Sequence, residues 1–395
     1  MKKKIYIILP MYFPVPAVRG GAVETLVEQL INENEEYGAL DITLFSIFDE
    51  KAKMSSKKYK NTNFVYIDST NLISKYKYSA SKIIHRLLNE RPYFLDDYHN
   101  EIYKYIKEHD NADFVIVEGG SDIDEFKRLS KLIGREKMIL HTHCASYDNK
   151  VTQRAAKIFN KIVSVSRFAL DTWNNSHVFN EAEVLYNGID LSIYNKIDKK
   201  EIEAIRDKYN FHKDDFVILF CGRLTEDKGV KELIQAVLKL NNKHIKLLIV
   251  GSANGEGANV TSYQKEIERL SKDNEGIKFT GFIHNSKINE LYSSCQCVAI
   301  PSICEDAFPL VKLEAMASRK PIIATISGGI PEGLPRDGSI LIEKSKESIV
   351  DNLVDAILKL YTKELDIDAM GELNLQESEN FSKENYYFNF LQKVS

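Results

Sequence analysis

Short apolar runs recur along the whole chain, and segments with the apolar spacing of an amphipathic helix separate them. Glycine, proline or clustered polar residues bound most of these runs, as is typical of buried strands. Strands that alternate with helices predict doubly wound parallel sheets, so the expected fold class is α/β. The predicted strands are 5–9, 41–48, 63–68, 113–117, 137–143, 161–166 and 183–186 in the first half, and 216–221, 247–250, 277–280, 297–300, 321–325 and 339–343 in the second. Helical stretches include 24–31 and 169–174.

Two domains are predicted, because 395 residues exceed one ordinary domain and strand patterns fill both halves of the chain. The first is expected to cover 1–190 and the second 191–380. The polar stretch 187–213 holds the expected boundary. Residues 381–391 carry aromatic side chains on one face and predict a final helix.

The segment 301–317 has the most informative pattern in the second half. It follows the predicted strand 297–300, and its later residues are good helix formers. The helix is therefore expected to start near Phe308, with Pro309 at a first helical position, where the missing N–H group of proline costs nothing.

The start of this helix offers a site for a phosphorylated ligand. The N–H groups of Leu310 and Val311 would be free to donate to a diphosphate at the carboxyl end of a parallel sheet. Glu314 could accept both hydroxyl groups of a ribose, and Asp306, eight residues earlier, would face a sugar. The alternative is an ordinary strand, loop and helix with two solvated acids.

Two cations follow the predicted strand that ends at Gly222. Arg223 and Lys228 together suit a pyrophosphate, because a guanidinium binds it through a fork of donors and an ammonium as a point charge. Taken singly, each is equally well explained as a surface cation.

Two further features lie in the first half. Gly20 and Gly21 sit in the loop between a strand and a helix, where backbone N–H groups can approach a phosphate closely, although a plain turn explains them too. His143 ends a predicted strand, and such a histidine is either structural or part of a site. We expect His141 to face the opposite side of that strand, into the packing.

Several motifs occur together along the chain. They are Gly20 to Glu24, Leu185 to Asp190, Gly222-Arg223-Leu224 with Lys228-Gly229, Phe279-Thr280-Gly281-Phe282, Pro301-Ser302 with Asp306 and Glu314 to Ala317, and Gly328 to Glu332. Together they resemble the retaining family-4 glycosyltransferases of GT-B fold (glycosyl transferases group 1). The resemblance spans nearly the whole chain and is weakest from about residue 50 to residue 111.

This resemblance implies two Rossmann-like domains that face each other across a cleft. The N-terminal domain would bind the acceptor and the C-terminal domain the nucleotide sugar, and a terminal helix, 381–395, would cross back onto the N-terminal domain. The implied activity is transfer of a sugar from a nucleotide-diphosphate donor, favouring a UDP-sugar, with retention of anomeric configuration. The family needs no cofactor and no bound metal.

Roles for individual residues follow from the same resemblance. Arg223 and Lys228, next to Gly222, would bind the donor phosphates, and Glu314 the ribose. The backbone of Phe282 and Ile283 would meet the base, and that of Phe308, Leu310 and Val311 the phosphate side of the donor. Gly21 would approach the donor, and His143 would lie near the reacting centre.

One residue departs from the family pattern. Asp306 takes the place of the first acid in Glu-x7-Glu and is one methylene shorter. Its carboxylate could therefore fall short of the donor sugar by roughly 1.5 Å. Glu305 is a rival for the sugar-facing carboxylate, but the register of Phe308 favours Asp306.

The sequence shows no dedicated carboxylate nucleophile of the kind that retaining glycosidases use, and this shapes the expected mechanism. A front-face displacement, in which the leaving phosphate helps to deprotonate the acceptor, fits better. Arg223 and Lys228 would then stabilise the developing charge on the leaving group.

Charge and cysteine content narrow the possible classes of protein further. The net charge of −4 argues against nucleic-acid binding. The five cysteines show neither zinc spacing nor a secreted disulfide pattern, and no signal peptide or membrane span is evident, so we expect a cytoplasmic protein. Two Asp-x-Asp triplets, Asp122 to Asp124 and Asp366 to Asp368, are treated as chance matches and not as metal sites.

Residues 71–91 lie within a stretch of the chain that has a local excess of positive charge. Between Lys51 and Arg91 there are ten Lys or Arg residues against two acids, and apolar residues recur at helical spacing. Such a helix either lies peripherally on the anionic inner face of the cell membrane or packs in the core with a solvated cationic face.

The leading hypothesis is a transferase that extends a saccharide, lipid-linked in the fullest version, for a bacterial surface polysaccharide. The alternatives are a synthase with a small soluble acceptor and a non-catalytic scaffold subunit of a partner transferase.

Overall fold

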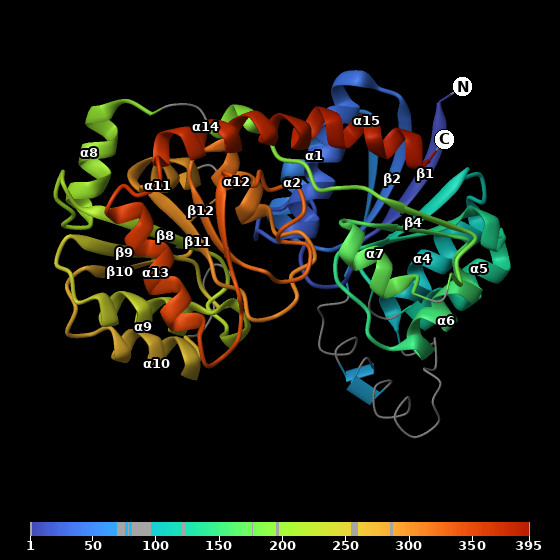
Figure 1. Ribbon diagram of the computed structural model, residues 1–395. Helices are drawn as coiled ribbons and strands as arrows, with labels where there is room; N and C mark the ends of the chain where they lie inside the picture. Colours follow the sequence, from blue (N-terminus) through green and yellow to red (C-terminus); the bar gives the residue numbers. More distant parts are fainter. Residues whose placement is uncertain are drawn as a thin grey trace. The chain divides into compact units, whose positions relative to one another are not determined.

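The computed structural model describes residues 2–68, 76–77, 79–80, 96–120, 123–175, 177–194, 197–253, 260–284 and 287–394 (Figure 1). The chain divides into two compact units, of which the first holds 1–187 together with 386–395 and the second holds 188–385. This division separates the units between Asn187 and Gly188, at the start of the polar stretch 187–213. The basic segment 71–91 lies outside the described residues, apart from 76–77 and 79–80.

The first unit is built on a seven-stranded sheet in the order β3-β2-β1-β4-β5-β6-β7, with parallel pairing throughout. Its strands are β1 Lys3–Ile8, β2 Leu40–Ile47, β3 Thr62–Ile67, β4 Phe114–Glu118, β5 Met138–Thr142, β6 Lys161–Ser164 and β7 Glu181–Val184. Its helices are α1 Ala22–Tyr37, α2 Glu50–Ser55, α4 Asp97–Glu108, α5 Lys127–Ile133, α6 Asn149–Ile158, α7 Arg167–Trp173 and α15 Lys383–Lys393, with short 3-10 turns at Ser56–Lys58, Ile123–Phe126 and Arg135–Lys137.

The second unit is built on a six-stranded parallel sheet in the order β10-β9-β8-β11-β12-β13. Its strands are β8 Phe216–Cys221, β9 Ile245–Val250, β10 Ile277–Gly281, β11 Cys297–Ile300, β12 Ile322–Thr325 and β13 Ser339–Ile342. Its helices are α8 Lys199–Lys208, α9 Val230–Leu240, α10 Ser262–Leu270, α11 Ile288–Ser294, α12 Leu310–Ala317, α13 Ile349–Tyr361 and α14 Ile367–Ser378, with 3-10 turns at Leu191–Tyr194, Glu226–Lys228 and Glu379–Phe381. The α/β prediction of two doubly wound sheets is confirmed.

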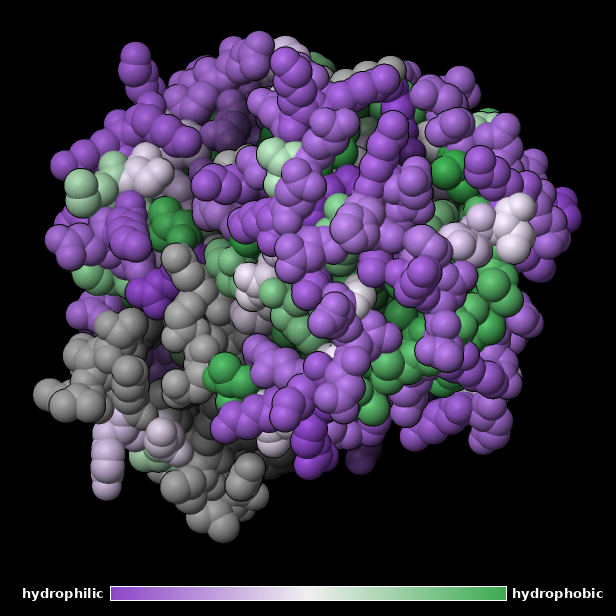
Figure 2. All heavy atoms as spheres, turned by 90° about the vertical axis from the view of Figure 1, so that its left-hand side faces the viewer, coloured by the Kyte–Doolittle hydropathy of each residue, from purple (hydrophilic) through white to green (hydrophobic). Residues whose placement is uncertain are grey.

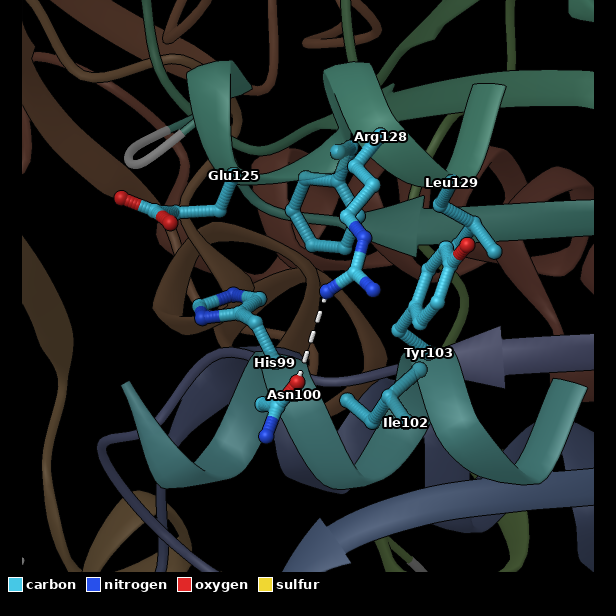
Figure 3. Close-up of a pocket in the computed structure, with 8 residues that line it drawn as sticks. His99, Asn100, Ile102, Tyr103, Glu125, Arg128 and Leu129 are labelled. Carbon is cyan, nitrogen blue, oxygen red and sulfur yellow. Dashed lines mark hydrogen bonds between the residues drawn. The ribbon is translucent and has the colours of Figure 1, made fainter. Parts of the chain in front are cut away.

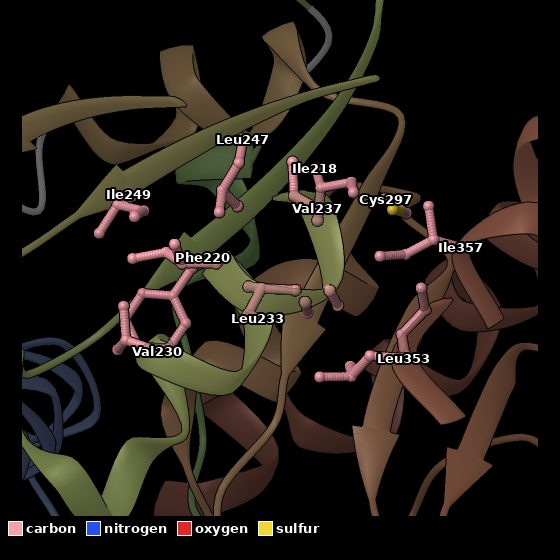
Figure 4. Close-up of a cluster of buried hydrophobic side chains, with 14 of the residues drawn as sticks. Ile218, Phe220, Val230, Leu233, Val237, Leu247, Ile249, Cys297, Leu353 and Ile357 are labelled. Atoms are coloured by element: carbon pink, nitrogen blue, oxygen red, sulfur yellow. The ribbon is translucent and has the colours of Figure 1, made fainter. Parts of the chain in front are cut away.

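Both sheets are buried on two faces, which explains why their strands are continuous apolar runs. Along β1, Tyr6 and Ile8 belong to one hydrophobic cluster, whereas Ile5 and Ile7 belong to another on the opposite face. In the second unit, Figure 4 shows side chains of β8 and β9 packed against those of α9 and α13.

Figure 2 shows one face of the molecule, on which most side chains are hydrophilic and the apolar ones gather toward the lower right. This distribution fits amphipathic helices that bury one stripe against a sheet. Among the described residues, no helix combines the length and the apolar character needed to cross a bilayer.

The terminal helix α15 packs on the first unit, as predicted. Tyr386, Tyr387 and Phe390 are buried in the same cluster as Ile5 and Ile7 of β1. The Tyr387 hydroxyl donates to Asn34 Oδ1 at 2.9 Å, and the red helix α15 accordingly lies beside the blue α1 in Figure 1.

Candidate functional site

Strands β8 and β11 are neighbours at the point where the order of the second sheet reverses. Ligands of doubly wound sheets bind outside the carboxyl ends of the strands at such a point. Gly222 and Arg223 directly follow β8, and the loop that leads to α12 follows β11. Gly222 is fixed there because its N–H donates to Val250 O at 3.0 Å.

Two glycines allow the loops around this point to approach each other closely. Gly229 has φ 69°, and a Cβ there would lie 2.0 Å from Pro301 O. Gly328 has φ 56°, and a Cβ there would lie 2.1 Å from Asp306 O. Any larger residue would push the loops apart, so these positions need glycine.

This close approach brings Lys228 to Asp306. Lys228 Nζ forms an ion pair with Asp306 Oδ1, and Ser302 Oγ donates to Asp306 Oδ2 at 2.5 Å. The Gly329 N–H donates to the backbone oxygen of Asp306 at 2.7 Å. The carboxylate of Asp306 is therefore held in place by a cation and a hydroxyl group.

Glu305 has a different partner. Its Oε1 pairs with Lys344 Nζ, and its Oε2 accepts the Gly328 N–H at 2.5 Å. Partial burial alone would raise the pKa of Glu305, but Lys344 and the Gly328 N–H lower it overall. The two neighbouring acids are thus bound to separate lysines, and Asp306 is the one joined to the predicted phosphate ligand Lys228.

Arg223 extends from the loop after β8 with a 65% exposed side chain, and Asp227 Oδ2 lies 3.9 Å from its NH2. Because this side chain is mostly exposed and its contact with Asp227 is long, the guanidinium can turn toward a ligand at little cost. Phe282 and Ile283 lie after β10, at the far edge of the same sheet, and both are partly buried.

The helix α12 begins at Leu310, two positions later than predicted. Pro309 is the N-cap, with extended φ −71° and ψ 135°, and is not a first helical residue. Its carbonyl accepts the Lys312 N–H at 3.2 Å, so Leu310 and Val311 are the first helical residues. Helix geometry leaves their N–H groups without intrahelical partners.

Glu314 lies one turn further along α12. Tyr292 OH donates to Glu314 Oε2 at 2.7 Å, and Tyr194 also hydrogen-bonds to this carboxyl group. Burial raises the pKa of Glu314, while the two tyrosines oppose that effect. The interpretation of Glu314 as an ordinary solvated acid is therefore wrong. The two tyrosines were missed because neither lies in a motif.

Lys312 is a second residue that the sequence analysis missed. It is fully buried, and its Nζ donates to Gly329 O at 3.2 Å and to Glu332 O at 2.5 Å. The same Nζ lies 3.5 Å from the ring centroid of Phe308, which is itself buried. Burial lowers the pKa of Lys312 well below its usual value. A lysine inside an apolar helical run was the available signal.

His143 lies in the first unit, beside Glu118 and His141. His143 Nε2 hydrogen-bonds to Glu118 Oε2 at 2.7 Å, and His141 Nδ1 lies 2.9 Å from the same oxygen. The expectation that His141 faces away from His143 is wrong. Side chains two residues apart point to the same face of a strand, and the two rings lie 4.4 Å apart.

Gly21 precedes α1 with φ 105°, and a Cβ there would lie 2.1 Å from Glu24 Oε2. Glu24 is buried, and burial raises the pKa of Glu24 to about 7. The negative charge of Glu118 acts in the same direction. Close packing around Glu24 therefore explains the glycine at position 21, independently of any ligand.

Two clusters in the described residues have the composition of a metal site, Glu118 with His141 and His143, and Asp96 with His99 and Glu125. Ligand atoms around a tetrahedral ion with bonds of about 2.0–2.1 Å would lie about 3.3 Å apart. The Glu118 to His143 distance and the His99 Nδ1 to Asp96 Oδ2 distance are both 2.7 Å. Both distances are those of hydrogen bonds and are shorter than the separation between two ligands of one metal ion.

The second of these clusters borders a cavity of about 20 Å³, which Figure 3 shows between α4 and α5. Arg128 lies over the ring of Tyr103 there, with NH1 3.5 Å from Asn100 Oδ1. This cavity has room for about one water molecule and not for a nucleotide sugar. In the Asp-x-Asp triplets, Asp366 caps α14 and Asp124 pairs with Arg154, whereas Asp122 lies outside the described residues.

Comparison with known proteins relates the second half of the chain to a known family. Residues 201–380 match the family Glycosyl transferases group 1. An uncharacterized glycosyltransferase of Methanocaldococcus jannaschii is 32% identical over 186 residues, which are 44% of this chain and 45% of that protein. Lipopolysaccharide 1,2-N-acetylglucosaminetransferase of Salmonella typhimurium is 29% identical over 203 residues, half of each chain. The matches thus span about half the length of these relatives.

The fold also matches a solved structure over nearly its whole length. The Anabaena protein HepE, determined in complex with UDP-glucose, covers 99% of each chain with a TM-score of 0.77 at 16% identity. The chain therefore has the two Rossmann-like units of the GT-B glycosyltransferase fold. Residues 201–380, which carry Arg223, Lys228, Asp306 and Glu314, form a glycosyl transferases group 1 domain.

Proposed function

We propose that this chain is a retaining glycosyltransferase that moves a sugar from a nucleotide-diphosphate donor, favouring a UDP-sugar, to a saccharide acceptor. The observation that carries the proposal is the meeting of Lys228, the start of α12 and the partly buried Glu314 beside the ends of β8 and β11. Glu314 lies close enough to Cys221, the last residue of β8, to raise the pKa of that thiol, although burial is the larger cause.

The donor would be bound by its charged and polar groups. The pyrophosphate accepts hydrogen bonds from Arg223, Lys228 and the N–H groups of Leu310 and Val311, with the helix dipole adding to the attraction. Glu314, already oriented by two tyrosines, accepts the ribose hydroxyls. These cations supply the charge compensation for a diphosphate, so we propose that the reaction needs no metal ion.

The reaction would proceed on one face of the sugar. As the bond to the diphosphate breaks, negative charge builds on the leaving oxygen, where Arg223 and Lys228 stabilise it. The leaving phosphate accepts the proton of the attacking hydroxyl group. Asp306, which neutralises Lys228 in the free protein, orients that ammonium until the donor arrives.

For the acceptor, we propose a lipid-linked saccharide of a bacterial surface polysaccharide, met by a cytoplasmic enzyme at the inner membrane face. The Salmonella typhimurium relative, which acts on lipopolysaccharide, supports this choice. The basic segment 71–91 would supply the membrane contact, through a charge attraction to anionic lipid. A synthase with a soluble acceptor would need no such contact.

Donor hydrolysis tests the proposal. Purified chain is incubated with UDP-, GDP- and ADP-sugars in EDTA, and release of free nucleotide diphosphate is measured with and without a saccharide acceptor. One donor should be consumed, and the anomeric configuration of the product should match that of the donor. A scaffold subunit would consume none of them, and the proposal would then be wrong.

A further inference from the structure

Glu118, the last residue of β4, is a buried carboxylate for which the proposed donor site has no use. Its side chain is 1% exposed, and in the parallel pairing of β4 with β5 it lies opposite His141. His143 directly follows β5, two residues after His141, and its ring lies 4.4 Å from that of His141 on the same side. One buried carboxylate therefore meets two imidazole rings.

The hydrogen bond between Glu118 and His143 defines where the proton sits on the ring. A carboxylate only accepts hydrogen bonds, so the His143 nitrogen 2.7 Å from Glu118 Oε2, which is Nε2, carries the hydrogen. In a neutral imidazole the other nitrogen, Nδ1, then carries a lone pair and accepts. This Nδ1 is buried and has no hydrogen-bond partner among the described residues.

The charge states of the cluster agree with this tautomer. Burial alone would raise the pKa of Glu118, but the two imidazoles, His141 foremost, lower it to about 2, so the carboxylate is ionised at neutral pH. Burial, followed by the nearby His141, lowers the pKa of His143, and Glu118 opposes this only in part. His143 is therefore neutral at pH 7.

The other titratable groups that interact with Glu118 are protonated or partly so. Glu24 of α1 has its pKa raised to about 7, mainly by burial. Tyr386 of α15 has its pKa raised well above the usual value, first by burial and then by Glu118. Neither adds a cation near His143. Glu118 is the hydrogen-bond acceptor at His143 Nε2, so it decides the tautomer of that ring.

We infer that Glu118 is a positioning residue that holds His143 in the Nε2–H tautomer, so that Nδ1 accepts a hydrogen bond from a hydroxyl group of a bound saccharide. A buried acceptor without a partner destabilises the free protein, and a bound hydroxyl group removes that cost. This inference rests on the proposed function, because glycosyl transfer is what brings a saccharide to the chain.

The test compares three proteins labelled with ¹⁵N-histidine at pH 7, using NMR spectra that distinguish the two imidazole tautomers. The wild-type spectrum should show His143 with hydrogen on Nε2. Glu118→Leu removes the acceptor and should shift His143 toward the Nδ1–H form. Glu118→Gln keeps an acceptor oxygen and should retain the Nε2–H form. Glu183→Leu, in the same unit but bound to Lys161 and Lys393, is the matched control and should leave the His143 signal unchanged.

Saccharide transfer supplies the second readout. Glu118→Leu should lower kcat at least tenfold, Glu118→Gln should recover it to within about threefold of wild type, and the dissociation constant for the nucleotide diphosphate should change less than twofold in both. Three results would each overturn the inference. The first is wild-type His143 with hydrogen on Nδ1, and the second is an unchanged His143 tautomer in Glu118→Leu. The third is a stoichiometric metal ion that is bound to the wild type and lost in Glu118→Leu. If the wild type consumes no donor, the proposed function fails, whereas the tautomer assignment is still decided by the spectra.

Discussion

In the loop between β11 and α12, Glu305 and Asp306 are adjacent acids that bind different lysines, Lys344 and Lys228. An ammonium that is already paired stays ordered until a ligand competes for it. In the proposed reaction, the donor pyrophosphate competes for Lys228 and leaves the Lys344 pair untouched. The sequence alone ranked Asp306 above Glu305, but it could not assign a lysine to each.

Lys228→Ala and Lys344→Ala therefore form a matched pair of variants. We expect Lys228→Ala to lower turnover at saturating donor at least tenfold, because the leaving group loses a preorganised cation. Lys344→Ala should lower it less than threefold. Turnover measured by release of nucleotide diphosphate decides between them, and equal effects of the two variants would contradict the role given to Lys228.

Glu24 makes the stability of the first unit depend on pH. Its pKa is raised from 4.5 to about 7, chiefly by burial, so the folded state favours the protonated form. The stabilisation is present below pH 4.5 and is lost as pH rises toward 7, with a total change of about 3 kcal/mol at about 1.4 kcal/mol per pKa unit.

Glu24→Gln should remove most of this dependence. We expect the variant to be more stable than wild type at pH 8 and about equal to it at pH 4.5, because an amide cannot ionise. Urea unfolding at both pH values measures the difference. A wild-type unfolding free energy that is flat across this range would show that Glu24 keeps its usual pKa.

At the scale of single elements, the sequence predicted the positions of the strands better than the contacts between side chains far apart in the chain. The apolar runs in both halves proved to be strands because both faces of each sheet are covered, which leaves an unbroken apolar signal. The helix α12 began later than expected because Pro309 adopted an extended N-cap conformation. The partners of Glu314 come from elsewhere in the chain, at Tyr194 and Tyr292, and no local pattern points to them.

The helix α12 is also joined to the loop 328–332 through Lys312. Lys312 Nζ donates to the backbone oxygens of Gly329 and Glu332, and Gly328 lies against Asp306. The loop therefore fixes Asp306, which in turn orients Lys228. Burying a lysine is unfavourable because its amine loses water. These contacts explain why a lysine nevertheless occupies position 312.

Lys312→Met tests this link at nearly constant volume. Two backbone oxygens lose their donor, so we expect the loop to shift and the dissociation constant for the nucleotide diphosphate to rise at least fivefold. Lys320→Met is the control, since Lys320 Nζ also donates to a backbone oxygen, that of Cys295 at 2.7 Å, away from the loop. Isothermal titration should show little change in nucleotide affinity for Lys320→Met. Unchanged affinity in Lys312→Met would mean that the loop holds its place without the lysine.

At the scale of the whole molecule, the order of segments along the chain does not match their division between the two units. The last residues, 386–395, belong to the first unit although the chain reaches them from the second. The aromatic face of 381–391 predicted a helix, and the resemblance predicted where it packs. Burial of Tyr386, Tyr387 and Phe390 in the cluster with β1 explains that preference, because the first sheet would otherwise expose its apolar face.

The stability of the first unit should therefore depend on α15, while nucleotide binding by the second unit should not. Phe390 is 2% exposed and Phe388, on the same helix, is 44% exposed. We expect Phe390→Ala to lower the unfolding free energy of the first unit by about 3–5 kcal/mol, as for a fully buried aromatic side chain. Phe388→Ala should cost far less. Calorimetry with and without UDP separates the units, since a ligand raises the melting temperature only of the unit that binds it. Loss of UDP stabilisation in Phe390→Ala would show instead that the donor site needs an intact first unit.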